Sequence, residues 1–158
     1  MKTATVHEIK QELLANKERA LVELCLRLAK FKKENKELLT YLLFEAHHEE
    51  GYITEVKELI TQEFELLDAK ANIYFNKKSI RKILRIATKH IRYTGSKQAE
   101  AAILIHFLTT LKESGIPYQR SNTLMNMYAL QIKKIKAALA GMHEDLQYDY
   151  KLALAEIE

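Results

Sequence analysis

The side chains whose type and spacing could best bind a ligand form a row of basic residues in the middle of the chain. When Asn76–Gly95 is wound as a helix at about 100° per residue, seven cations fall within an arc of about 140°. Isoleucine, leucine and alanine side chains occupy the opposite side, which predicts a helix with one buried apolar face and one basic face. The seven candidate binding residues are Lys77, Lys78, Arg81, Lys82, Arg85, Lys89 and Arg92.

Three roles are compatible with this basic face. If glutamates of the preceding segment lie against it, it is a solvated surface whose ion pairs are each worth about 0 to 1 kcal/mol. If it is open, its cations could meet several nucleic-acid phosphates, with an affinity that falls steeply with salt. It could also lie on a membrane surface, although the core needs the isoleucine face. Lys77 and Lys78 would suit a phosphate at the first turn, unless the helix begins one turn earlier.

A second group of residues has the composition of a metal site. Glu45 and His48 show the Glu-x-x-His spacing of di-iron carboxylate bundles, and Glu49 and Glu63 could add carboxylates. Glu63 also falls inside the apolar arc of its predicted helix. Such sites need a second Glu-x-x-His pair, which the sequence lacks. We therefore expect no metal and no cofactor, and keep these four residues as candidates only.

Other reactive residue types are isolated. His90 and His106 lie on apolar helix faces, where a hydrogen-bonded core histidine is the expectation. Cys25, the only cysteine, stands in a helical apolar pattern and is predicted to be a small buried residue. The sequence contains no Gly-rich phosphate loop, no nucleophile elbow and no His-Glu-x-x-His motif. We expect a protein that is not an enzyme.

Composition predicts the elements that must position the basic face. The 158 residues are the length of a single domain, 1–158, and only four glycines and one proline are present, which favours long helices. Charge is segregated along the chain: residues 44–68 carry eight acids and one lysine, for −7, and residues 69–99 carry nine bases and no acid, for +9. An acidic segment is therefore followed directly by a basic one.

Caps and apolar spacing predict about eight helices. Thr5 and Glu8 form a capping box for the first, and Asn16 and Asn35 are expected to cap the second and third. Gly51 is the predicted end of the third helix and Gly95 that of the basic helix. The helix over 97–113 is apolar nearly all round, so we expect it at the centre. The remaining helices are predicted over 52–67, from residue 121 or 122 to 141, and over 142–158.

One internal repeat is visible. Shifting the chain by 44 residues aligns Leu39 with Ile83, Gly51 with Gly95 and Ile60 with Leu104. Both units read helix, glycine turn, helix, and a period of 44 lies within the range of HEAT and armadillo repeats. The predicted fold is all-α, with stacked helical hairpins of α-solenoid character. The alternative is an irregular helical bundle.

The segments Glu37–Ile53, Tyr74–Arg85 and Gly95–Gln98 resemble a family of small, uncharacterised all-helical bacterial proteins, over roughly residues 35–115. The resemblance implies an all-helical fold and a bacterial cytoplasmic setting, and it implies no activity, cofactor or site. Residues 1–8 lack the apolar core of a secretory signal, and no apolar run is long enough to span a bilayer. We expect a cytoplasmic interaction module that binds a protein partner through the basic helix. The alternative hypothesis is a non-specific nucleic-acid or phosphate binder, and the third is a metal–carboxylate helical protein. The sequence predicts no oligomeric state.

Overall fold

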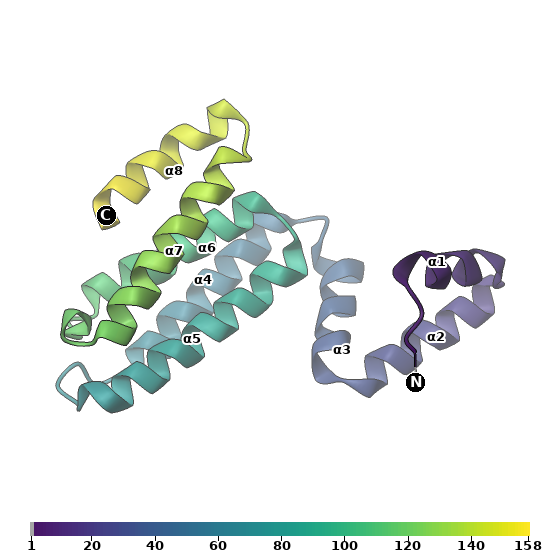
Figure 1. Cartoon of the computed structure of the whole chain (residues 1–158), viewed down its shortest axis with the longest axis horizontal. Helices are drawn as coiled ribbons and strands as arrows, with labels where there is room; N and C mark the ends of the chain where they lie inside the picture. Colours follow the sequence, from purple (N-terminus) through teal and green to yellow (C-terminus); the bar gives the residue numbers. More distant parts are fainter. Residues whose placement is uncertain (1) are drawn as a thin grey trace. The chain divides into compact units, whose positions relative to one another are not determined.

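The computed structural model describes residues 2–158, and within that range it contains helices and no strand (Figure 1). This confirms the all-α class. The chain divides into two compact units, one ending at Phe44 and the other spanning Glu45–Glu158. The expectation of a single domain stays a prediction. The helices are α1 (Val6–Ala15), α2 (Glu18–Phe31), α3 (Lys33–Thr40), α4 (Glu49–Glu65), α5 (Ile73–Thr94), α6 (Lys97–Glu113), α7 (Asn122–Ala140) and α8 (Glu144–Ile157), with a π-helical turn at Tyr41–Glu45 and a 3-10 turn at Tyr118–Arg120.

The N-terminal unit consists of three amphipathic helices and most of the π-helical turn, and among residues 2–44 only Tyr41, in that turn, is buried. Its capping box is confirmed, because the Thr5 N–H donates to the Glu8 carboxylate at 2.7 Å and the Glu8 N–H donates to the Thr5 hydroxyl at 3.3 Å. No residue of α1, α2 or α3 is buried. The prediction that Cys25 is buried is therefore wrong, since this residue is exposed to solvent. An apolar stripe at helical spacing shows which residues share a face, but it cannot show whether another element covers that face.

Three predicted helix boundaries, two starts and one end, are also wrong. Asn16 ends α1, donating its side-chain amide to the Glu12 carbonyl at 2.7 Å, and Lys17 precedes α2. Asn35 lies inside α3, where its side-chain amide donates to the Leu28 carbonyl at 2.8 Å. Gly51 lies in the first turn of α4 instead of ending a helix. The break falls earlier, at the π-helical turn and the residues after it, so Gly51 and Gly95 do not have equivalent roles.

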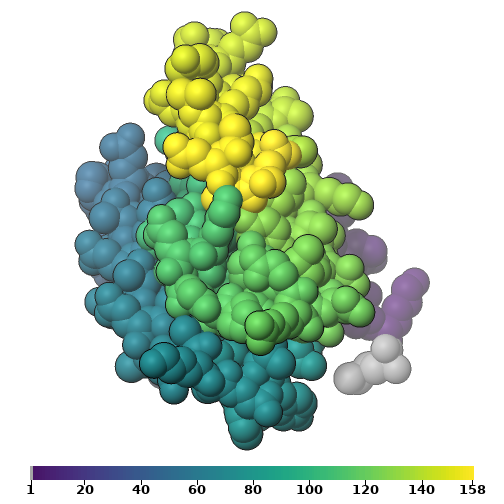
Figure 2. All heavy atoms as spheres, turned by 90° about the vertical axis from the view of Figure 1, so that its left-hand side faces the viewer, coloured from purple at the N-terminus to yellow at the C-terminus, as the bar shows by residue number. Residues whose placement is uncertain are grey.

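The C-terminal unit packs around α6, as its nearly continuous apolar sequence predicts. Nine residues of α6 are buried, and Ala99, Ile103, Phe107 and Leu108 are fully excluded from solvent. Helices α4, α5, α7 and α8 all pack on α6. The Phe64 ring of α4 lies 5.6 Å from the Phe107 ring. Figure 2 shows α8, in yellow, packed against the green surface of α6 and α7.

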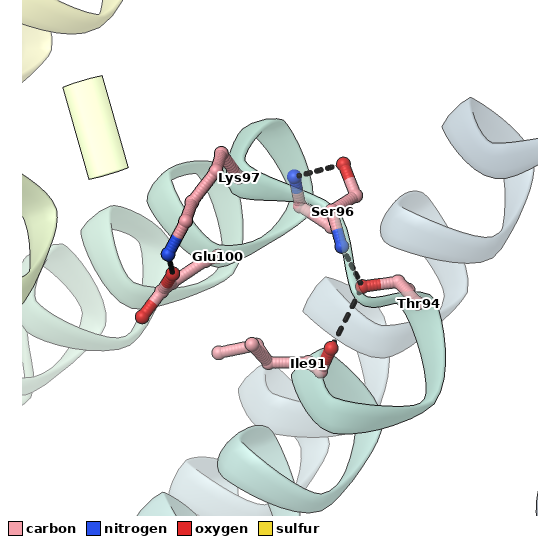
Figure 3. Close-up of polar contacts among 6 residues, drawn as sticks. Ile91, Thr94, Ser96, Lys97 and Glu100 are labelled. Atoms are coloured by element: carbon pink, nitrogen blue, oxygen red, sulfur yellow. Dashed lines mark hydrogen bonds and ion pairs between the residues drawn. The ribbon is translucent and has the colours of Figure 1, made fainter. Parts of the chain in front are cut away.

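The turn between α5 and α6 forms as its sequence predicts. Gly95 has a φ of 61°, the left-handed conformation that glycine adopts without a Cβ penalty. The Thr94 hydroxyl donates to the Ile91 carbonyl at 2.8 Å, and the Ser96 hydroxyl accepts the Ala99 N–H at 3.2 Å (Figure 3). This reversal sets α5 directly beside α6, so that the apolar face of α5 is buried and its basic face is turned away from the core.

The last helix is attached to α7 by a tyrosine. The Tyr128 hydroxyl donates to the Ile157 carbonyl at 2.6 Å, and the Tyr128 ring stacks on Tyr118 with 5.2 Å between centroids. Burial, followed by the neighbouring Tyr118, raises the pKa of Tyr128 to about 12. Helix α7 starts where the sequence predicts, at residue 121 or 122: Ser121 is its cap, because the Ser121 hydroxyl accepts the Leu124 N–H.

Candidate anion-binding site

Helix α5 presents its cations because its other face is anchored in the core. Ile80, Ile83 and Ala87 are buried at 0%, 1% and 0% exposure. Asn72 caps the helix by accepting the Tyr74 N–H at 2.9 Å. The helix therefore begins at Ile73, one turn before Lys77 and Lys78. These two lysines do not stand at the first free N–H groups, and the predicted phosphate site at the helix start is not formed.

Six of the seven predicted cations line one groove, which we call the basic groove. Its volume is about 690 Å³, and Met127 of α7 forms part of its wall. Leu84 and Thr88 also line it, and no acidic residue does. The Tyr74 ring lies at one end, with the Lys77 ammonium 5.3 Å from its centroid. The cations of the groove are Lys77, Lys78, Arg81, Arg85, Lys89 and Arg92.

The seventh cation has a different role. The Lys82 ammonium lies 3.1 Å from the Glu63 carboxylate of α4 and does not line the basic groove. Lys82 occupies one edge of the basic arc, the edge nearest α4. Glu63 falls within the apolar arc of α4 because it reaches this lysine, and its side chain is mostly shielded from solvent. The pair fastens α4 to α5 and removes Lys82 from the set of binding cations.

The remaining acids of residues 44–68 leave the basic groove open. Glu49 accepts a hydrogen bond from the Ser96 hydroxyl at 2.6 Å. Glu50, Glu55, Glu58 and Glu65 are exposed, and none forms an ion pair within the described chain. Five of the groove cations have no carboxylate of residues 2–158 within 4.0 Å; they are Lys77, Lys78, Arg81, Arg85 and Arg92. The acidic segment therefore neutralises one edge of the basic face and leaves the groove strongly positive.

The four candidate metal ligands have separate surroundings. Glu49 and Glu63 hydrogen-bond to Ser96 and Lys82, while Glu45 ends the π-helical turn and His48 precedes α4. Across the described part of the chain, no three His, Cys, Asp or Glu side chains are grouped so that they could hold a metal ion.

Both apolar-face histidines are hydrogen-bonded, as predicted. The His90 Nδ1 and the Tyr52 hydroxyl share a hydrogen bond of 2.7 Å, and the His106 Nε2 and the Thr61 hydroxyl share one of 2.9 Å. Both rings are half-buried. Burial lowers the pKa of His106, and the charge of Lys57 adds to this effect. The contacts fit structural histidines between helices, and neither ring lines the basic groove.

Sequence reasoning did not identify two residues of the site. Met127 is one of several apolar residues of α7, and only the packing of the C-terminal unit places it beside α5. Tyr74 and Phe75 are similar aromatic residues just before the basic row, so residue type alone does not show which one lies in the groove. The start of α5 at Ile73 places Tyr74 there. An exposed aromatic residue within one turn of a basic row is the signal that could have identified it.

Comparisons of the chain with protein-family models, with curated proteins and with solved structures found no match. The resemblance to small all-helical bacterial proteins accordingly stays a prediction. Among residues 2–158, every helix is too short or too polar to cross a bilayer.

Proposed function

We propose that this protein is a non-enzymatic binding module that holds a nucleic acid in the basic groove of α5 through its phosphate backbone. The observation that carries the proposal is that six cations and no acidic residue line one groove. A concave surface of one charge sign focuses the electric field and attracts counter-ions. Phosphate contacts by lysine and arginine supply most of the affinity of non-specific nucleic-acid binding.

The length of the cation row sets the length of strand that it could contact. Fifteen residues separate Lys77 from Arg92. At a rise of 1.5 Å per residue, the row spans about 22 Å. This corresponds to roughly six nucleotides of one B-form strand at 3.4 Å each. Six cations over that length match the density of phosphates along one strand.

Tyr74 favours a single strand over a duplex. Its side chain is 62% exposed and lies at the end of the groove, where an unpaired base could stack on the ring. Base stacking on an aromatic residue contributes about 1–3 kcal/mol per base and tolerates any sequence. α5 is anchored along its core face and flanked by α7, so it is poorly placed to enter a major groove, where bases are read. We expect binding with little sequence preference.

An acidic protein segment is the second candidate ligand. Leu84 and Met127 give the basic groove an apolar strip beside its cations, which would suit an acidic peptide that also carries apolar side chains. This keeps the protein-interaction role expected from the sequence. The acidic peptide and the nucleic acid are alternative ligands of the same basic groove.

The α-solenoid arrangement and a cytoplasmic location belong to the same proposal. The contacts between helices support the α-solenoid arrangement. Helix α4 packs on α6 and α6 on α8, while α5 packs on α4 and α7 on α6, as in stacked hairpins. Supporting the cytoplasmic location, the single cysteine cannot form a disulfide within the chain.

Fluorescence anisotropy with a mixed-sequence single-stranded oligonucleotide tests the proposal. We expect Arg81→Glu/Arg85→Glu to abolish binding at low salt, because two groove cations become acids. The control is Lys10→Glu/Lys133→Glu, which changes net charge equally at exposed positions outside the groove. An equal loss of oligonucleotide affinity in both variants would show that net charge alone controls binding, and it would contradict a defined site. Binding of poly-glutamate but not of the oligonucleotide would favour the acidic protein ligand.

A further inference from the structure

The N-terminal unit exposes an apolar surface that a folded protein does not ordinarily leave in water. Phe31 is 76% exposed, Leu43 63% and Phe44 64%, and no residue of α1, α2 or α3 is buried. Isolated exposed leucines are normal, whereas contiguous apolar patches mark interaction sites. Part of this surface is concave. Leu26, Leu39, Leu43 and Phe44 form the floor of a groove of about 590 Å³ between α2 and α3, which we call the α2–α3 groove.

Lysines form the rim of the α2–α3 groove. Lys30, Lys32, Lys33 and Lys36 all line it, together with no acidic residue. Lys33 is 3.7 Å from the Glu37 carboxylate, and the other three form no ion pair in the described chain. An apolar groove between two helices is the shape that accepts an amphipathic helix. A lysine rim selects a helix with acidic flanks, and it opposes pairing of two such grooves with each other.

The chain itself carries a helix of this kind. Helix α8 buries Leu154 and Ile157, while Tyr148 and Leu152, one turn apart on another face, are 67% and 54% exposed. Asp145, Asp149 and Glu156 lie beside this stripe at helical spacing. Residues 144–158 contain five acids and one lysine, a net charge of −4. The exposed face of α8 is therefore an apolar stripe with three acids along one side.

We propose that the α2–α3 groove of one copy of this chain binds the exposed face of α8 of a second copy. Tyr148 and Leu152 cover the apolar floor, and the acids beside them meet the lysine rim. Each chain has one groove and one α8, so a reciprocal exchange closes a two-fold dimer, and a one-way exchange builds an open chain of copies. Both surfaces lie outside the basic groove of α5, so this association does not depend on nucleic-acid binding.

Charge exchange tests the proposal in the full-length chain. Sedimentation velocity over a wide range of protein concentration should show that the wild-type protein associates. Lys32→Glu/Lys36→Glu, on the groove rim, and Asp145→Lys/Asp149→Lys, on α8, should each weaken association by about tenfold or more, because like charges then oppose each other. Combining all four substitutions should restore association, because the attraction is re-formed with its signs exchanged.

The controls separate a specific contact from general charge effects. Lys10→Glu/Lys133→Glu changes the net charge as much as the rim variant does and should leave association unchanged. Far-ultraviolet circular dichroism confirms that each variant remains helical. A wild-type protein that is monomeric at every concentration overturns the proposal, and so does a four-fold variant that fails to regain association. Binding of the monomer to anionic vesicles, lost in Lys32→Glu/Lys36→Glu, would assign the groove to a membrane surface instead.

Discussion

The two units use the same kind of helix and reach opposite degrees of burial. Helix α2 and helix α5 both carry a one-sided apolar stripe, yet α2 buries no residue and α5 buries five. The difference lies in their neighbours. The C-terminal unit contains α6, which is apolar nearly all round and can receive a stripe from several sides. Each helix of the N-terminal unit has only one apolar face. When two such faces meet, the side chains at their edges stay exposed to solvent, because no third element covers them.

The comparison has a functional counterpart in the two lysine-bearing grooves. In the basic groove, six cations lie on a helix whose apolar face is mostly buried, so charge is the main means of recognition. In the α2–α3 groove, lysines surround an apolar floor, so area and charge act together. The first arrangement suits a phosphate backbone and the second an amphipathic helix.

Core truncation should give the largest contrast between the units. Leu108→Ala in α6 removes a fully buried side chain, and we expect it to lower the free energy of unfolding by about 2–5 kcal/mol. Leu28→Ala in α2 removes a side chain that is 60% exposed and should change it by no more than about 0.5 kcal/mol. Urea denaturation followed by circular dichroism measures both. Equal losses would show that the N-terminal stripe is covered in solution.

A matched pair of asparagines sharpens the same contrast. Asn76 is buried and donates its side-chain amide to the Asp68 carbonyl at 2.9 Å, whereas the partly exposed Asn35 makes a similar bond of 2.8 Å to Leu28. Asn76→Ala should cost about 1–3 kcal/mol, because it leaves a carbonyl without its partner away from water. Asn35→Ala should cost less, since water can replace the amide. A larger loss at Asn35 would contradict the assigned burial.

Acidification should weaken the folded protein through His106. Burial lowers the pKa of this residue in the folded state, so the unfolded chain binds a proton more readily. The stability contributed by neutral His106 is therefore present above the unfolded pKa of about 6.5 and is lost as pH falls below it. Denaturation midpoints between pH 7.5 and pH 5 should fall less in His106→Gln than in wild type. Parallel curves for the two proteins would contradict this role.

A small effect on stability is expected at the α4–α5 ion pair. Glu63→Gln should cost only about 0 to 1 kcal/mol, because Lys82 is 60% exposed and screened by solvent. The same variant should bind the oligonucleotide slightly more tightly, because one acid near α5 is removed. Thermal unfolding and anisotropy measure the two effects. Weaker binding would mean that the pair orients α5 for ligand.

Sequence patterns predicted local structure where the determinants are local. The Thr5–Glu8 box, the Gly95–Ser96 reversal and the Ser121 cap depend on residues a few positions apart, and all three are confirmed. Gly51 failed as a helix end because it lies in the first turn of α4, where a Cβ would collide with the His48 ring. Cys25 failed because burial depends on distant elements, and an amphipathic stripe is the same whether or not a partner covers it.

The candidate site was predicted in part for the same reason. The cations share a face because of helical periodicity, which the sequence contains. The removal of Lys82 from the set depends on Glu63 of α4, and the groove wall depends on Met127 of α7. These contacts come from tertiary packing. The sequence raised the question of whether acids cover the basic face, and only the positions of the glutamates could answer it.

The salt dependence of oligonucleotide binding tests the central claim most directly. If all six groove cations contact phosphates, the logarithm of the association constant should fall with the logarithm of salt concentration with a slope of about −4, at roughly −0.7 per contact on a single strand. Removing one cation with Arg85→Gln should make the slope shallower by about 0.7, and Lys133→Gln should leave it unchanged. A slope near zero, or one insensitive to Arg85, would contradict the basic groove as the binding site.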